Sequence, residues 1–529
     1  MTAAAAAPKR RTGAVVAVLA SVFFVCSLDA MVTAVAVRAI GEALRGMTQL
    51  VWLTTATSLA TAVVTPTVGK LADQFGRKGF MMAGMAIVLA GTAGAGLCAS
   101  MPQLAACRAT QGLGWGMVWP MTYAFIQRTV PPRLRGRYIG FLTLAGLVGA
   151  AVAPVVGGAL LGTAEIWGLA SWRWLFWAQV PVMAANLAAS ALVLPREPSL
   201  PAQPVDWSGA AALALAVTPI VMLLARLREW HWDTPAPYCW IAAGLIGAAL
   251  FRGSQRGMGD AGVMPPRMLR LHTFRLGLPV MALASFGQVG AGAVLPLFWL
   301  VARGLSPTAA GAMAFVATAG ALAGSVFESR FMSATGRYKA QTVAGIALQA
   351  AGLITVMSGG ADAPIWMLAA AVFAAGAGAT ASIGPIEVAM QRSVPPAEYG
   401  TAAGSVLLAR TLGLTAGSAL LLGALFAAAP GAIVRRLEAS GARIPPGLAF
   451  DINDTTTLPL LPPEARAAVE HGFADAVAVA LAPCLVALAI ALVCALRLRE
   501  RRFEPRSARP GAAQAQGVSP GLPSNSPKS

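Results

Sequence analysis

The chain has 529 residues, of which 57% are hydrophobic and 11% are charged. About a quarter of the residues of a typical soluble domain are charged, so this composition excludes most soluble classes and indicates a membrane protein. The formal net charge of +18 would also suit a nucleic-acid-binding protein, but the Lys and Arg residues form short clusters between apolar runs, so no nucleic-acid partner is expected.

Apolar runs of membrane-spanning length recur along the whole chain. One helical span needs about 20 apolar residues. We predict fourteen spans, at residues 14–37, 50–68, 80–99, 103–126, 138–162, 174–194, 209–225, 238–252, 275–299, 308–328, 341–358, 364–388, 401–428 and 474–497. The first run is longer than the roughly 7 to 15 residues of a signal-peptide core, so we interpret it as a span.

The basic residues predict the orientation of these spans. Most Lys and Arg residues fall on a single side of the membrane when the N-terminus is placed inside. By the positive-inside rule, both termini are then expected to be cytoplasmic, in the cell inner (plasma) membrane.

The six cysteines give no sign of a metal site. They lie singly inside apolar runs, with no C-x-x-C spacing, at Cys26, Cys98, Cys107, Cys239, Cys484 and Cys494. Such residues behave as small buried hydrophobes, so neither a metal nor a disulfide framework is expected.

An internal repeat divides the chain into two halves. Residues 127–132 (QRTVPP) recur as residues 391–396 (QRSVPP). At the same offset Gly112 pairs with Gly376, Gly114 with Gly378 and Gly149 with Gly413. Two parallel repeats of six spans, with the substrate site between them, are an architecture of secondary transporters.

The fold class predicted from this repeat is an all-α polytopic membrane protein, with two six-helix bundles plus two inserted helices. Its parts are a cytoplasmic N-terminus (1–13), an N-terminal bundle (14–200), an insertion with a cytoplasmic linker (201–270), a C-terminal bundle (271–500) with an outer loop at 430–472, and a tail (501–529). The tail is rich in Pro, Ser, Gly and Ala and is expected to be disordered.

Three ionisable residues lie deep in predicted spans: Asp29, Arg108 and Arg410. Charged groups at such depth are costly and indicate function. Asp29 lies about 12 Å and Arg108 roughly 8 Å from the same membrane face, so the two can pair. An acid that pairs with Arg in one state and is desolvated in another can bind and release a proton. A static structural ion pair is the alternative.

The fourth predicted span carries a polar and aromatic stripe. Arg108, Gln111, Trp115 and Trp119 share one helical face. This face predicts a substrate cavity of mixed polarity, to which Arg410 would add a contact for an anion. The alternative for each Trp is packing in the core or against lipid. The same face of the second half carries no polar group, so the expected proton chemistry belongs to the first half.

The fifth predicted span is rich in small residues and contains a proline. Gly149, Pro154, Gly157 and Gly158 would form a kinked, closely packed hinge, because proline removes a backbone donor and small residues let helices approach. Position 418, the counterpart of Pro154, is a serine. The hinge is therefore also expected in the first half alone.

These segments together resemble the major facilitator superfamily, and within it the fourteen-span drug:proton antiporters. The charged loop 69–78 (GKLADQFGRK) resembles the signature loop after the second helix of that superfamily. Residues 108–114 (RATQGLG) resemble the antiporters' fourth-helix motif, Leu28-Asp29 their first-helix acidic motif, and Pro154, Gly157 and Gly158 their antiporter signature. The resemblance extends from about residue 14 to residue 500.

The resemblance implies roles for the charged residues. Asp29 would carry the coupling proton and Arg108 would modulate it. In the loop, Gly69, Asp73, Gly76, Arg77 and Lys78 would form a conformational latch, since an acid and a basic partner near a helix N-terminus can hold one state closed. A loop that is merely soluble is the alternative. The second half holds a less complete copy of this loop, which ends at residues 336–339 (GRYK) and has Ser333 in place of Asp73, so only one half carries a full latch.

The function predicted is secondary active transport, not enzymatic catalysis: proton-driven efflux of hydrophobic or amphipathic small molecules, drugs included. No cofactor is expected beyond the proton gradient, and no G-x-x-x-x-G-K-[ST] motif for an ATP-driven pump occurs. The expected partners are the substrate, protons and membrane lipid, and the docking of a periplasmic adaptor protein stays open. The alternatives are a proton-coupled importer or uniporter of a metabolite, and a transport-inactive membrane sensor.

The deep charges also suggest the charge of the substrate. They are one acid, Asp29, against two arginines, Arg108 and Arg410. Neutral, zwitterionic or anionic amphipaths are therefore expected at least as much as cations.

Overall fold

The computed structural model describes residues 9–44, 51–130, 135–161, 165–195, 206–225, 233–259, 262–395, 398–441 and 461–500. The first group of elements is α1 (Lys9–Ala43), α2 (Val51–Phe75), α3 (Arg77–Ala95), α4 (Met101–Thr129), α5 (Arg135–Leu161), the hairpin β1 (Glu165–Ile166) and β2 (Leu169–Ala170), α6 (Ser171–Trp177) and α7 (Gln179–Val193). Next come α8 (Trp207–Ala225) and α9 (Ala236–Met258). The last group is α10 (Pro266–Arg270), α11 (His272–Leu297), the π-helical turn η3 (Phe298–Ala302), α12 (Pro307–Thr335), α13 (Lys339–Gly359), α14 (Ile365–Arg392), α15 (Tyr399–Ser440) and α16 (Pro463–Leu496).

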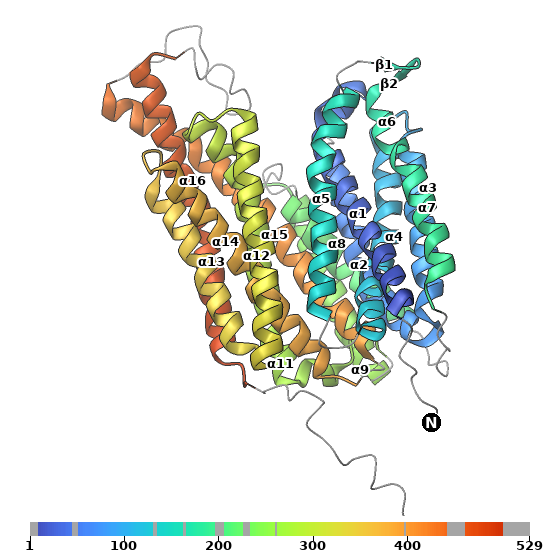
Figure 1. Ribbon diagram of the computed structural model, residues 1–529. Coiled ribbons are helices and arrows are strands. Elements are labelled where there is room, and N and C mark those ends of the chain that lie inside the picture. Colours follow the sequence, from blue (N-terminus) through green and yellow to red (C-terminus); the bar gives the residue numbers. More distant parts are fainter. Residues whose placement is uncertain are drawn as a thin grey trace, which may run out of the picture.

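Two helical bundles stand side by side (Figure 1). One holds α1 to α7 and the other α11 to α16, with matching helix pairs in each. In the first bundle α4 packs on α2 and α3, and α1 packs on α5; in the second, α14 packs on α12 and α13, and α11 packs on α15. The predicted all-α fold of two bundles is confirmed.

Glycines of the repeat occupy equivalent close contacts in the two bundles. Each faces a neighbouring helix so closely that a Cβ atom would collide with a backbone carbonyl group. Gly112 faces Thr57 and Gly376 faces Ala317, while Gly149 faces Phe24 and Gly413 faces Ala282. The sequence repeat is therefore also a repeat of helix packing, in which small residues let backbones approach.

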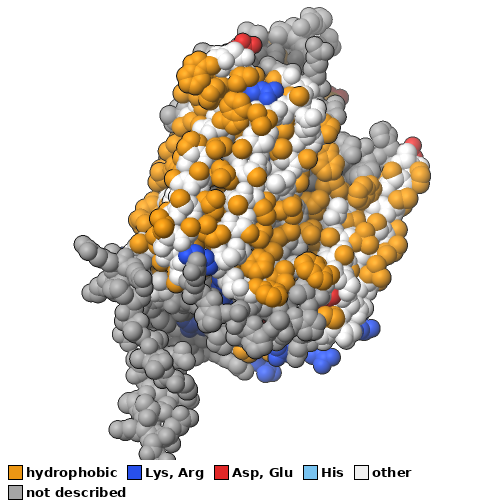
Figure 2. All heavy atoms as spheres, turned by 90° about the vertical axis from the view of Figure 1, so that its right-hand side faces the viewer, with side chains coloured by type: hydrophobic (Ala, Val, Ile, Leu, Met, Phe, Trp, Pro, Cys, Tyr) orange, Lys and Arg blue, Asp and Glu red, His pale blue; other side chains and the backbone are white. Residues whose placement is uncertain are grey.

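The surface of the helices is that of a multi-pass membrane protein. Within the described residues, nine helices are long and apolar enough to cross a membrane. The other predicted spans lie on α2, α4, α5, α8 and α9. Figure 2 shows apolar side chains over the wide middle of one face, with most of its visible Lys and Arg residues at the lower end. On α7, for example, Leu192 is 86% exposed, which is unfavourable in water and favourable in lipid.

The inserted helices α8 and α9 pack on each other, and α8 also contacts both bundles through α2 and α15. A hydrophobic cluster joins the three elements, with Leu213 and Val217 from α8, Ala62 from α2 and Leu408 from α15. Asp206 precedes α8, and its carboxylate accepts a hydrogen bond from the backbone N–H of Gly209 at 2.6 Å, which caps the helix. The insertion is thus a structured element that bridges the two bundles.

The predicted outer loop at 430–472 is helical at both its ends. α15 continues to Ser440 and α16 begins at Pro463. At 42 residues, α15 is about 63 Å long, well beyond the roughly 30 Å of a bilayer core. Gly472 packs directly on Ile433, and Arg436 pairs with Asp475 at 2.7 Å, so the two extensions support each other. The predicted disordered tail (501–529) lies outside the described residues.

Candidate functional site

A polar layer crosses the first bundle between two hydrophobic clusters. One cluster includes Val25, Met85 and Trp115, and the other includes Val32, Ala95 and Leu104. Between these positions lie four buried polar side chains: Asp29 on α1, Thr92 on α3, and Arg108 and Gln111 on α4. Apolar side chains therefore separate the layer from either end of the bundle.

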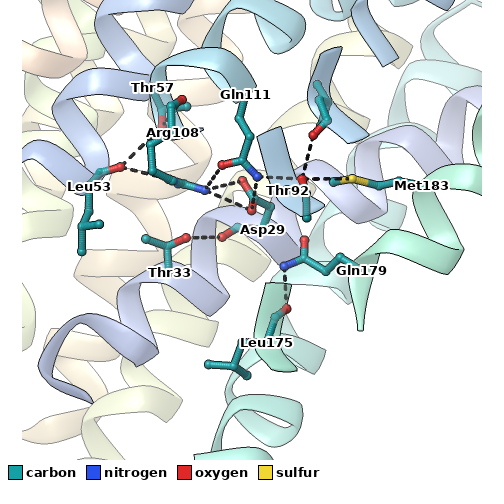
Figure 3. A network of polar contacts seen from close by, with 11 residues as sticks. Asp29, Thr33, Leu53, Thr57, Thr92, Arg108, Gln111, Leu175, Gln179 and Met183 are labelled. Carbon is teal, nitrogen blue, oxygen red and sulfur yellow. Dashed lines mark hydrogen bonds and ion pairs between the residues drawn. The ribbon is translucent and has the colours of Figure 1, made fainter. Parts of the chain in front are cut away.

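Asp29 and Arg108 form the centre of this layer (Figure 3). The Arg108 Nη1 atom donates to both carboxylate oxygens of Asp29, at 3.0 and 3.1 Å. The same nitrogen donates to Gln111 Oε1 at 2.7 Å, and Arg108 Nε donates to the backbone carbonyl of Leu53 on α2 at 3.1 Å. The pairing that the two depths allowed is therefore present.

The network extends from this pair to α3 and α7. Gln111 Nε2 donates to Thr92 Oγ1 at 2.7 Å and lies 3.5 Å from Asp29 Oδ1. Thr92 Oγ1 lies 3.3 Å from the Met183 sulfur on α7 and donates to the Val88 carbonyl at 2.8 Å. One contiguous set of hydrogen bonds thus joins α1, α2, α3, α4 and α7.

Both side chains of the pair are buried, so the loss of one charge would destabilise the other. Asp29 is 2% and Arg108 is 3% exposed. Two charges removed from water are tolerated only when they pair closely and their remaining hydrogen-bonding groups are satisfied, and loss of either partner leaves an uncompensated buried charge. Each of the two side chains therefore needs the other to stay charged at this depth.

The two tryptophans of the predicted stripe lie in different surroundings. Trp115 is buried within the first bundle and lines a space of about 20 Å³ together with Val22, Met85, Met183 and Asn186. Since a water molecule needs about 10 to 15 Å³, this space is too small for an amphipathic substrate. Trp119 is half-buried, with its ring 4.5 Å from Phe23. The cavity role of both residues stays a prediction, better supported for Trp119.

Arg410 has acidic neighbours that the sequence analysis did not select. Its charge acts on Glu387 of α14 and on Tyr123 of α4, in the other bundle. Glu387 also interacts with Glu328 of α12, whose carboxylate lies against Gly384. Glu387 lies close to the end of the predicted span 364–388, and Glu328 is the last residue of the predicted span 308–328. Two acids and one arginine of the second bundle thus act electrostatically on Tyr123 of the first bundle.

The residues of the predicted latch are arranged around a helix break. Gly76 separates α2 from α3 with a φ of 95°, which favours glycine, and Gly336 has a φ of 65° at the second copy of the loop. Gly69 and Arg77 are buried. The Lys78 ammonium group donates to the Leu194 carbonyl at 2.7 Å, within the first bundle. The side chain of Asp73 lies outside the described residues, so the latch stays a prediction.

The predicted hinge lies on α5, which is helical throughout its described length. Gly149 contacts the backbone of Phe24 on α1, and Gly157 is buried. The side chain of Pro154 and the surroundings of Gly158 lie outside what the structure describes. The close α1–α5 contact is therefore present, while the hinge motion stays a prediction. No cluster of three or more His, Cys, Asp or Glu side chains in the described part of the chain could hold a metal ion.

The two bundles, their repeated contacts and the buried charged layer define a multi-pass membrane transporter. The family model of the Major Facilitator Superfamily matches residues 19–418. The chain belongs to that superfamily, and it is therefore a transporter and not an enzyme.

Curated relatives are similar over much of the chain. An uncharacterized MFS-type transporter of Mycobacterium tuberculosis is 30% identical over 382 residues, which cover 71% of this chain and 54% of the relative. The chain thus spans about half the length of that relative. A tetracycline resistance determinant of Streptomyces rimosus is 30% identical over 44% of this chain and 67% of its own. An efflux pump of Gibberella fujikuroi is 28% identical over 75% of this chain and 72% of its own.

Solved structures share the fold at low sequence identity. A bacterial homologue of the iron transporter ferroportin, in an outward-facing state, has a TM-score of 0.58 at 13% identity and covers 92% of this chain and 100% of its own. A proton:xylose symporter has a TM-score of 0.58 at 15% identity and covers 93% of this chain and 95% of its own. These likenesses concern the fold alone.

Proposed function

We propose that this protein is a proton-driven efflux transporter of hydrophobic or amphipathic small molecules, with Asp29 as the proton carrier. The observation that carries the proposal is the buried bond between Asp29 and Arg108, held in a network that joins five helices. A charged pair at this depth is costly and is retained where function requires it.

Protonation would change this network at its centre. A neutral Asp29 loses most of its attraction for Arg108, whose guanidinium keeps Gln111 and the Leu53 carbonyl as acceptors. Because these contacts come from α1, α2 and α4, weakening one of them alters the balance between two arrangements of the bundle. Gly149, at the contact of α5 with α1, would allow the helices to shift.

Efflux as the direction is supported by relatives named as an efflux pump and a tetracycline resistance determinant. The two helices α8 and α9 between the bundles support the fourteen-span type. Within this proposal the protein lies in the inner membrane with both termini cytoplasmic and uses the proton gradient, without a cofactor. A docked periplasmic adaptor is not required by the scheme.

The substrate would bind between the bundles, where the rings of Trp119 and Tyr123 of α4 stack with their centroids 6.4 Å apart and the charge of Arg410 of α15 acts on Tyr123. Glu328 and Glu387 offset the arginine charge there. The expectation that neutral, zwitterionic or anionic amphipaths are at least as favoured as cations was based on Asp29, Arg108 and Arg410 alone, without these two acids. We therefore propose hydrophobic and amphipathic substrates of either charge or none.

Transport assays in proteoliposomes with an imposed pH gradient test this function. A panel of anionic, neutral and cationic fluorescent dyes would identify the substrate class. In everted vesicles, Asp29→Asn is expected to abolish substrate-dependent proton release while dye binding persists. Gly140→Ala on α5, where a Cβ meets open space, is the control. Unchanged coupling in Asp29→Asn would remove Asp29 from the role.

A further inference from the structure

One buried acceptor on the same polar layer receives no hydrogen bond from any described residue. It is the side-chain oxygen of Gln179, a residue that is 3% exposed. Its amide nitrogen donates to the Leu175 carbonyl at 2.9 Å. Since that contact requires a donor, the nitrogen is fixed toward Leu175 and the oxygen faces the opposite way.

The position of Gln179 along its helix places it at the level of Asp29. Leu175 and Phe176 before it belong to one hydrophobic cluster of the first bundle, and Met183 after it belongs to the other. Asp29 lies between the same two clusters on α1, which packs on α7. Gln179 is therefore a fifth member of the polar layer.

The buried face of α7 shows that Gln179 points into the first bundle, toward the Asp29 network. Its buried residues Gln179, Met183, Asn186 and Ser190 follow one another at helical spacing and form one face. Met183 on that face lies 3.3 Å from Thr92 Oγ1, inside the Asp29 network. Figure 3 shows the Gln179 oxygen turned toward Thr92 and Asp29.

Protonation of Asp29 would supply a donor for this acceptor. An ionised carboxylate offers acceptors alone, whereas a neutral carboxyl gains one O–H donor. A buried O–H without a partner is costly, and so is a buried amide oxygen without one. Protonation of Asp29 would satisfy both groups in a single hydrogen bond.

Resting on the proposed proton-carrier role of Asp29, we propose that Gln179 is a positioning residue that accepts a hydrogen bond from protonated Asp29 and so stabilises the proton-loaded transporter. Among the described residues, the titratable Arg108 pairs with Asp29, and the Cys26 thiol on the same helix interacts with Asp29 electrostatically. The side chains that α3 and α7 present, Thr92, Met183 and Gln179, do not titrate.

Infrared titration of the full-length protein in proteoliposomes tests the proposal. The carbonyl band of protonated Asp29 is assigned by its loss in Asp29→Asn. Gln179→Leu is expected to move the midpoint of that band to lower pH by about half to one unit, the worth of one hydrogen bond. Asn186→Leu, which removes a buried amide from the same face of α7, is expected to leave the midpoint in place.

A second variant moves the midpoint in the opposite direction. Gln179→Glu keeps an acceptor and adds a negative charge, so Asp29 should hold its proton to higher pH. The double variant Asp29→Asn with Gln179→Glu isolates the band of the new carboxyl group. The pH profile of ethidium transport should shift in the same direction as the midpoint of the band in Gln179→Leu and in Gln179→Glu.

The outcomes separate this inference from the proposed function. A midpoint of the Asp29 band that is the same in Gln179→Leu and wild type overturns the role of Gln179 and leaves Asp29 as the carrier. Absence of any band that depends on Asp29 overturns both. Shifts of opposite sign in Gln179→Leu and Gln179→Glu, with Asn186→Leu unchanged, support the positioning role.

Discussion

The Lys78 ammonium group donates a hydrogen bond to the backbone carbonyl of Leu194 at 2.7 Å and thereby joins the start of α3 to the end of α7. A second bond from the same group reaches the Ala191 carbonyl at 2.6 Å. Carbonyls at a helix C-terminus lack partners within the helix and attract cations. The last residue of the charged loop therefore stabilises the first bundle itself.

Replacement of Lys78 by Met should lower the thermal stability of the purified protein. Two charge-assisted hydrogen bonds are lost, one of them at an exposed carbonyl, so the expected cost is about 1 to 2 kcal/mol. The measurement is the midpoint of thermal unfolding in detergent. Lys339→Met, at the second copy of the loop, is the control. Equal midpoints for Lys78→Met and wild type would show that the hydrogen bonds of Lys78 to α7 do not stabilise the first bundle.

Separate and joint removal of the two central charges should show whether the ion pair is a unit. Asp29→Asn or Arg108→Gln alone leaves a buried charge without its partner and should cost about 3 to 5 kcal/mol. The double variant removes both charges and should cost clearly less than the sum of the two, although coupling is lost. Thermal unfolding of the four proteins measures this, and additive losses would show that the two side chains act independently.

The close contact between α5 and α1 gives a third prediction. A Cβ at Gly149 would collide with the carbonyl of Phe24, so Gly149→Val should destabilise the protein by about 1 to 3 kcal/mol, as overpacking does. Gly140→Val lies on the same helix, where nothing stands within 4 Å of an added Cβ. The folded fraction recovered from membranes should fall for Gly149→Val alone; equal recovery of both variants would argue against a tight α1–α5 contact.

Sequence alone could predict the centre of the candidate site because Asp29 and Arg108 are charged, and charge in an apolar span is rare. It could not select Thr92 or Gln179, since uncharged polar side chains are frequent in membrane helices and their use depends on which helix faces them. Glu328 and Glu387 were missed for another reason. Both stand near predicted span ends, where an acid normally reaches water, and only the packing of α12 on α14 encloses them.

The two-bundle fold could be predicted because its helix contacts require particular residues at particular positions. The repeat of residues 127–132 at 391–396 and the paired glycines reflect contacts that only small residues permit, so the pattern survives in the sequence. Apolar run length did not predict that the predicted outer loop at 430–472 is helical at both its ends, because these ends extend past the apolar runs. Arg436 pairs with Asp475, at the start of the predicted span 474–497, across α15 and α16, and apolar run length gives no signal of this contact.

Asp206 provides a pH-dependent prediction outside the membrane spans. Burial alone would raise the pKa of this carboxyl group, but hydrogen bonds outweigh that effect and hold the pKa below its ordinary value. The donors to this carboxylate are Ser254 at 2.7 Å, Gly209 at 2.6 Å, Gln255 at 2.7 Å, Ser208 at 3.0 Å and Val263 at 3.3 Å. They come from α8, α9 and the segment after α9, so one carboxylate holds the insertion together.

A lowered pKa in the folded state means that Asp206 stabilises the protein fully above its unfolded value of about 3.9, and that this contribution is lost as pH falls through the folded value. Asp206→Asn places an amide where the donors converge and should cost about 1 to 3 kcal/mol at neutral pH. The difference in thermal midpoint between Asp206→Asn and wild type should decrease as the pH is lowered below about 3.9, because wild-type Asp206 then also becomes neutral. Asp233 lies at an exposed position before α9. The thermal midpoint of Asp233→Asn should therefore equal that of wild type at both neutral and acidic pH. A difference between Asp206→Asn and wild type that stayed constant on acidification would mean that the charge of Asp206 does not contribute, and that its shape alone holds α8 and α9 in place.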